Sequence, residues 1–110
     1  MDLVVGPGPL RGSVRAPSSK SVAHRALICA AVSSAPTFVE CTDPSQDIDA
    51  TARCLAALGA TVDAVPGRGF SVSPVPDAVE GPVTLDCGES GSTLRFMVPL
   101  AAALGADTTF

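Results

Sequence analysis

An internal repeat with an offset of 70 residues is the feature that most constrains the fold of this chain. When Arg25 is placed over Arg95, segment 20–25 (KSVAHR) aligns with segment 90–95 (SGSTLR). In both copies the pattern predicts a strand, a polar turn, a helix with arginine in its first turns, an alanine-rich stretch and another strand. The order strand, helix, strand, helix, strand, strand, followed by a second start, predicts a mixed α/β fold built from repeated units.

Hydrophobic periodicity and turn residues give the expected boundaries of the elements. Asp43 is predicted to cap the second helix, with Pro44 in its first position, Gln46 completing a capping box and Gly59 ending it. Pro66-Gly67-Arg68 is typical of a hairpin turn. The predicted strands are 10–16, 37–40, 61–65, 69–73, 83–86 and one beginning at 107, and the predicted helices are 19–33, 44–58 and 92–104.

Charge and hydropathy exclude several classes of protein. The net charge of -4 argues against nucleic acid as a partner. Between Leu3 and Val39 there are four basic residues and no acidic ones, which suits a small anionic ligand. No apolar run is long enough to cross a bilayer, and the first residues lack the features of a signal peptide, so we expect a cytoplasmic protein without membrane contacts.

The four cysteines have neither CxxC spacing nor a nearby histidine partner. Metal ligation and a disulfide framework are therefore not expected. Cys29 and Cys54 fall within predicted helices, and we predict that both are small buried apolar side chains.

The first helix start carries the only lysine of the chain, Lys20, after Pro17-Ser18-Ser19. A helix start offers unpaired backbone N–H groups and a partial positive charge. Ser21 and Arg25 are four residues apart and share a helix face, so the arginine could bind a carboxylate or phosphate that the serine also contacts. An ordinary capped helix with exposed cations explains the same residues and remains an open alternative.

The second candidate segment is the turn 86–96 (DCGESGSTLRF). Its two glycines allow close approach of the backbone to a ligand, and its hydroxyls stand at another helix start. It is not a Walker A loop, because no Gly-Lys-Ser/Thr follows, and it lacks the Gly-x-Ser-x-Gly of a hydrolase elbow. Alone, the segment supports only modest anion binding.

Together the two segments resemble one family. Segment 17–27 (PSSKSVAHRAL) is similar to the first substrate motif of the 5-enolpyruvylshikimate-3-phosphate (EPSP) synthases, and segment 88–96 (GESGSTLRF) to their glycine-rich motif. Segment 43–59, with Asp47, also fits the family pattern. The related UDP-N-acetylglucosamine enolpyruvyl transferases usually have Lys-Asn where Lys20-Ser21 stands, and they lack the Glu-Ser-Gly-Ser-Thr segment.

The resemblance implies transfer of the enolpyruvyl group of phosphoenolpyruvate to the 5-hydroxyl of shikimate 3-phosphate, in the shikimate pathway of aromatic amino-acid biosynthesis. It implies no metal and no organic cofactor, and a monomeric full-length relative. By position it makes Lys20 a contact of both substrates, Ser21 and Arg25 contacts of shikimate 3-phosphate, and Gly91 a contact of phosphoenolpyruvate. Further residues are expected beside these contacts rather than on substrate: Arg95, Ser92 and Glu89.

The family fold implies two lobes of three βαβαββ units each, an inside-out α/β barrel with the active site between the lobes. Residues 1–110 would then hold a first unit at about 10–80 and the start of a second at 83–110. The catalytic acid–base residues of the family lie beyond this chain, so we expect an incomplete, inactive part of the enzyme. The alternative is a stand-alone βαβαββ module that binds a phosphorylated metabolite or a protein partner without chemistry. His24 and Glu89 replace the asparagines common in relatives; we expect a structural role for His24.

Overall fold

The computed structural model describes residues 1–110 and has a mixed α/β architecture of three helices and five strands. The elements are, in chain order, α1 (Lys20–Ala31), β1 (Thr37–Glu40), α2 (Gln46–Ala57), β2 (Thr61–Val65), β3 (Gly69–Ser73), β4 (Pro82–Thr84), α3 (Gly91–Ala103) and β5 (Asp107–Thr109). No helix is long and apolar enough to cross a membrane.

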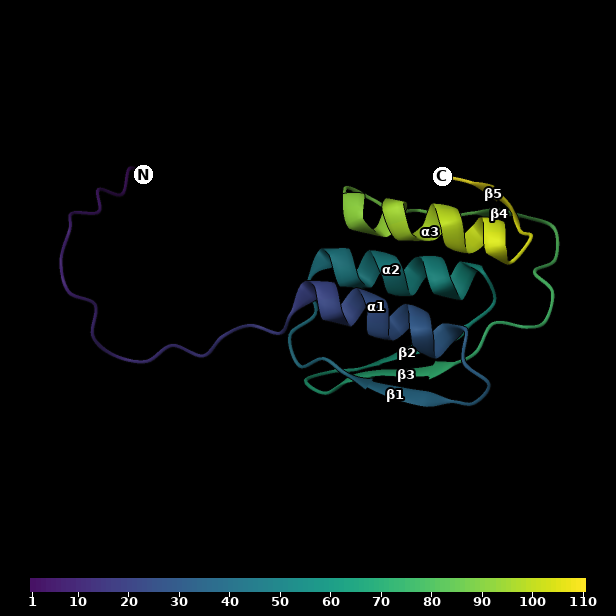
Figure 1. Ribbon diagram of the computed structural model, residues 1–110, viewed down its shortest axis with the longest axis horizontal. Coiled ribbons are helices and arrows are strands. Elements are labelled where there is room, and N and C mark those ends of the chain that lie inside the picture. Colours follow the sequence, from purple (N-terminus) through teal and green to yellow (C-terminus); the bar gives the residue numbers. More distant parts are fainter.

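The strands form two separate sheets. In the three-stranded sheet the order is β1-β3-β2, and β3 pairs antiparallel with both neighbours, so β1 and β2 run in the same direction. Helix α1 packs on β1 and β3, and α2 packs on β2. Strands β4 and β5 form a parallel pair that α3 connects. Figure 1 shows the three helices side by side between the two sheets, with α2 in the middle.

The predicted repeat is visible in the positions of the elements. Strand β5 begins 70 residues after β1, and α3 begins 71 residues after α1. The strand predicted at 10–16, however, is wrong. These residues form no strand and are fully exposed in an arm that runs away from the folded body (Figure 1). Alternating side chains favour extended backbone, but a strand also needs a neighbouring strand for its N–H and C=O groups, and the arm has none here.

The start of α2 differs from its prediction in a way that matters for the site. Ser45, not Asp43, is the N-cap, and its hydroxyl accepts a hydrogen bond from the Ile48 N–H. The Asp43 carboxylate is engaged elsewhere, since the Ser18 hydroxyl donates to it at 2.5 Å and the Ser18 N–H at 3.3 Å. These bonds lower the pKa of Asp43. Asp43 therefore fastens the segment before α1 to the loop before α2.

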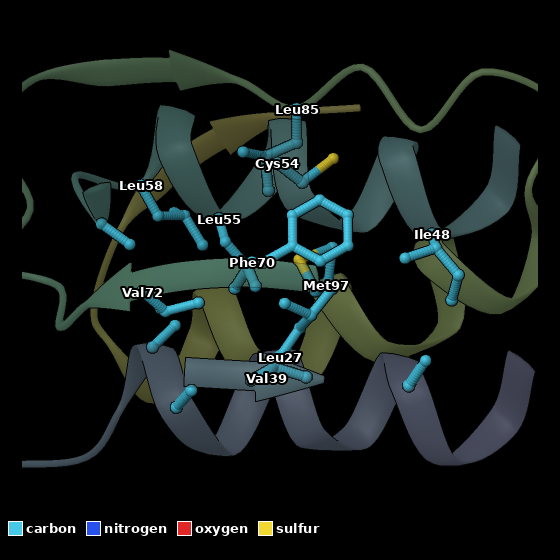
Figure 2. Close-up of a cluster of buried hydrophobic side chains, with 14 of the residues drawn as sticks. Leu27, Val39, Ile48, Cys54, Leu55, Leu58, Phe70, Val72, Leu85 and Met97 are labelled. Carbon is cyan, nitrogen blue, oxygen red and sulfur yellow. The ribbon is translucent and has the colours of Figure 1, made fainter. Parts of the chain in front are cut away.

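One apolar core joins the helices to both sheets. Leu27 of α1, Leu55 of α2, Val72 of β3 and Met97 of α3 have no exposed surface, and Figure 2 shows their side chains gathered in one cluster. Burial of Cys54 in this core is confirmed. The predicted burial of Cys29 is wrong, because its position on α1 faces solvent. Since α2 contacts both α1 and α3, the core fixes the three helix starts relative to one another.

Candidate functional site at three helix starts

All three helices begin with the same local structure, a serine whose hydroxyl accepts from the third helical N–H. The bonds are Val22 N–H to Ser19 at 3.4 Å, Ile48 N–H to Ser45 at 3.4 Å and Thr93 N–H to Ser90 at 3.1 Å. A single serine satisfies one of the free donors of a helix start. The first two N–H groups of each helix therefore have no partner within the helix.

The three starts meet at one end of the molecule. The Lys20 ammonium, at the first position of α1, lies 2.5 Å from the Asp47 carboxylate at the second position of α2. The Thr93 hydroxyl, in the first turn of α3, donates to the Asp47 backbone carbonyl at 3.2 Å. Figure 1 shows the helices running in the same direction, so the positive ends of their dipoles point to the same side. The arrangement can bind anions.

Asp47 is the acidic counterpart of this positive end. The hydrogen bond from Lys20 is the main reason that the pKa of Asp47 is lowered, so the carboxylate stays ionised at neutral pH. Both side chains keep contact with solvent, at 56% exposure for Lys20 and 32% for Asp47. An exposed pair of this kind contributes little to stability. It holds the lysine across the start of α2, where the ammonium remains available to a ligand.

A buried hydrogen-bond network lies directly beneath the helix starts. His24 Nδ1 is 2.7 Å from the Thr51 hydroxyl, which is 2.9 Å from the Thr93 hydroxyl. The Ser90 hydroxyl lies 2.7 Å from the same Thr93 oxygen. All four side chains are buried. The network therefore links α1, α2 and the cap of α3.

The donors in this network have one consistent direction. The Asp47 carbonyl can only accept, so the Thr93 hydroxyl hydrogen is used there, and Thr93 accepts from both Thr51 and Ser90. Thr51 must then accept from His24, which places the imidazole hydrogen on Nδ1. His24 Nε2 is left as a bare acceptor, and it has no hydrogen-bond partner. A neutral His24 satisfies every hydroxyl of the network.

We predict that His24 makes stability fall in mild acid. Burial lowers the pKa of His24 below its ordinary 6.5, because a proton on Nε2 would have no acceptor. The unfolded chain takes up that proton below pH 6.5 while the folded chain resists it. The free energy of unfolding should therefore drop below pH 6.5, by at most about 1.4 kcal/mol per pH unit. Urea unfolding at intervals from pH 7.5 to 5 measures the slope.

The matched variant is His24→Asn, whose amide can replace the Nδ1 donor but does not titrate. Its stability should be flat over the same pH range, which lies above the titration of the carboxylates. An unchanged slope in this variant would assign the acid sensitivity to another group.

The glycine-rich turn is held by an arginine of α2. Arg53 donates to the Asp86 backbone carbonyl at 3.2 Å from Nε and 3.0 Å from Nη2. The Asp86 carboxylate in turn accepts from the Gly88 N–H at 3.0 Å. Gly88 has φ +54°, a left-handed conformation that favours glycine. The turn thus enters α3 at a fixed angle to the start of α2.

Two pockets flank the start of α2. One, of about 310 Å³, lies towards the glycine-rich turn, and its lining includes the acidic side chains Asp47, Asp49 and Glu89 beside Arg53. Glu89 makes no ion pair there. The other, of about 220 Å³, lies towards α1 and is lined by residues that include Ser18, Ser19, Lys20 and Ser45. An anion is favoured on the Lys20 side.

Sequence comparison identifies the family. The profile of EPSP synthase (3-phosphoshikimate 1-carboxyvinyltransferase) matches residues 4–110. The chain belongs to the EPSP synthase family. Among curated relatives named 3-phosphoshikimate 1-carboxyvinyltransferase, that of Clostridium kluyveri is 42% identical over 106 residues, 96% of this chain and 25% of the relative. That of Clostridium beijerinckii is 43% identical over 115 residues, 99% of this chain and 26% of the relative.

A third relative of the same name, from Synechococcus sp. (strain RCC307), is 44% identical over 100 residues, which is 88% of this chain and 23% of the relative. The chain thus spans about a quarter of the length of these EPSP synthases. Its predicted family membership is confirmed.

The residues predicted from the two EPSP synthase motifs lie on both sides of α2. Lys20, Ser21 and Arg25 are exposed on the first turns of α1. The others, Gly91, Ser92, Arg95 and Glu89, are exposed at the beginning of α3 or in the turn before it. The structure brings the two groups to one end of the molecule, with the start of α2 between them. Arg25 and Arg95 make no ion pair.

Sequence reasoning missed the role of three side chains. Thr51 and Thr93 were not singled out as a link, and Arg53 was not expected to hold the glycine-rich turn. Thr51 did carry a signal, because it is a polar residue between Ile48 and Leu55 on the apolar face of α2. A hydroxyl in such a position requires a buried partner.

Proposed function

We propose that this chain supplies part of the substrate site of an enzyme that transfers the enolpyruvyl group of phosphoenolpyruvate to the 5-hydroxyl of shikimate 3-phosphate and releases phosphate. The observation that carries the proposal is the meeting of three serine-capped helix starts beside Lys20. Both substrates carry phosphate and carboxylate groups. An enzyme that joins them must hold like charges close together, and fixed dipoles with a nearby cation can do this.

The proposed contacts follow from position. Lys20 lies where it can reach either substrate, and Ser21 and Arg25 extend the same face of α1 towards shikimate 3-phosphate. Asp47 orients the lysine through its ion pair. No side chain proposed here donates or accepts a proton in the reaction, so we assign no catalytic residue to this chain.

Gly91 is suited to phosphoenolpyruvate. It is the first residue of α3, and no atom lies within 4 Å of the position that a Cβ would occupy. The open space lets an anionic group approach the backbone N–H groups of the helix start. Arg95, Ser92 and Glu89 surround this position and would adjust its charge without binding substrate directly.

We further propose that residues 10–80 and 83–110 are a first βαβαββ unit and the start of a second, within the inside-out barrel of a monomeric cytoplasmic enzyme. The equal spacing of β1 and β5 after α1 and α3 supports the repeat. In this proposal residues 10–16 become a strand once the remainder of the protein provides a partner. The enzyme would need neither a metal nor an organic cofactor.

Calorimetric titration with shikimate 3-phosphate tests the proposal. We expect the 110-residue chain to bind the ligand and the Lys20→Ala variant to lose about 2 kcal/mol of binding free energy, or roughly thirtyfold in Kd, since a charge-assisted hydrogen bond to phosphate is removed. Thermal stability should change little, because the Lys20–Asp47 pair is exposed.

Arg11→Ala is the matched control, because it removes a cation from the exposed arm, away from the helix starts. This variant should bind as the unaltered chain does. Equal losses in both variants would show non-specific charge attraction. Binding of unrelated phosphorylated metabolites with the same affinity would favour the alternative of a stand-alone binding module.

A further inference from the structure

Two buried thiols lie side by side beneath the glycine-rich turn. Cys54 of α2 has no exposed surface, and its Sγ is 3.9 Å from that of Cys87, which follows β4 and is 9% exposed. Figure 2 shows Cys54 on the inner side of α2 beside Leu85, two residues before Cys87 in the chain. The other two cysteines, Cys29 and Cys41, contact no sulfur.

The two thiols differ in access. Cys87 lines the pocket of about 310 Å³ together with Gly88, Glu89 and Ser90, whereas Cys54 does not reach it. A small molecule in this pocket can therefore meet the Cys87 sulfur, and Cys54 can be reached only through Cys87. Burial, and next the neighbouring Cys87, raise the pKa of Cys54 to about 12, so Cys54 remains a protonated, weakly nucleophilic thiol at neutral pH.

We propose that Cys54 and Cys87 are a redox-active pair that a peroxide closes into a disulfide. In the first step the Cys87 sulfur attacks one peroxide oxygen and the O–O bond breaks, which gives a sulfenic acid on Cys87 and, from hydrogen peroxide, one water. In the second step the Cys54 sulfur attacks the Cys87 sulfur, the S–O bond breaks, and the thiol proton leaves with the hydroxyl as a second water. Two thiols are oxidised and one peroxide is reduced.

Closure must move the turn rather than the helix. A disulfide requires the sulfurs to approach from 3.9 Å to about 2.05 Å. Cys54 is fixed in the middle of α2, while Cys87 belongs to a loop, and the left-handed Gly88 follows it. The Cys87 carbonyl accepts the Ser90 N–H at 3.0 Å, so a shift of Cys87 pulls on the cap of α3. Oxidation would thereby displace the α3 side of the anion site.

Peroxide treatment followed by peptide mapping tests the pair. The folded chain is exposed to hydrogen peroxide, transferred to acidic denaturant, alkylated with an iodoacetamide-type reagent and digested. We expect a peptide that links Cys54 to Cys87, in at least about tenfold excess over any other pairing, because neighbouring groups react with a high effective concentration. Cys29 and Cys41 should be recovered alkylated, and a dithiol reductant should restore all four thiols.

Single serine variants separate the two steps. Cys54→Ser should stop at the sulfenic acid, which dimedone traps on Cys87, and Cys87→Ser should leave Cys54 unoxidised. Cys29→Ser is the matched control and should form the link as the unaltered chain does.

Two results would overturn the proposal: the Cys54–Cys87 link forming equally well in chain unfolded before oxidation, or oxidation confined to Cys29. As a second readout that needs no variant, amide signals of Gly88 to Gly91 should shift on oxidation and return on reduction. These outcomes do not depend on which metabolite the helix starts bind.

Discussion

Replacing Gly69 by alanine is expected to unfold most of the chain. Gly69 is the first residue of β3 and lies between β1 and β2, opposite Glu40 and Val65. Its φ of +151° is rarely adopted by other residues, and a Cβ would lie 2.0 Å from the Val39 carbonyl oxygen and 2.8 Å from the Cys41 nitrogen. Both obstacles are backbone atoms, so no side-chain rotation removes the clash.

Relief would require β1 to separate from β3 at this end, with loss of sheet hydrogen bonds and of core contacts made by Val39. We expect a loss of at least about 4 kcal/mol, which is comparable to the total stability of a small domain. Far-ultraviolet circular dichroism during urea unfolding would measure it.

Gly67→Ala is the matched control two residues away. Gly67 also has a positive φ, +73°, but nothing lies within 4 Å of its missing Cβ. The cost should be the left-handed backbone alone, about 1 kcal/mol. Similar losses in the two variants would show that backbone conformation, rather than the approach of β1, sets the requirement for glycine.

Thr93→Val should produce the second largest loss, although it barely changes the volume of the side chain. The hydroxyl of Thr93 takes part in three hydrogen bonds, with Thr51, Ser90 and the Asp47 carbonyl. Without it, the buried Thr51 and Ser90 hydroxyls lose their acceptor. Each unsatisfied buried group costs about 1–3 kcal/mol, so we expect about 3–5 kcal/mol in urea unfolding.

Thr93→Ser keeps the hydroxyl and removes one methyl group, which should cost only about 1 kcal/mol. The comparison separates hydrogen bonding from packing. A valine variant as stable as the serine variant would mean that water replaces the missing hydroxyl. The loss should also be smaller when His24→Asn is already present, if the residues act as one network.

Much of the fold could be predicted because its signals are local. Strands 37–40, 61–65 and 69–73 were predicted at their observed bounds, since a three-residue turn at 66–68 fixes the register between the last two. The helices were predicted to within two residues at most ends. Serine before Lys20 and glycine after Leu58 mark where helical hydrogen bonding begins and ends.

The errors have a common physical origin in contacts between distant segments. Residues 10–16 have the pattern of a strand but no neighbour to pair with, and Asp43 was the better local cap until Ser18 bound it. The candidate cations could be found from the sequence because helix starts are visible in it. The network from His24 to Thr93 could not, because it exists only when three helices pack in parallel.

The order β1-β3-β2 has a consequence for solubility. Two of the three strands are edges, and an unpaired edge can pair with the edge of another molecule and start aggregation. The edges here are four and five residues long, and each carries one carboxylate, Glu40 and Asp63. With a net charge of -4, like molecules repel one another at the very strands that could join them. The acidic residues that suit anion binding least thus protect the sheet from self-association.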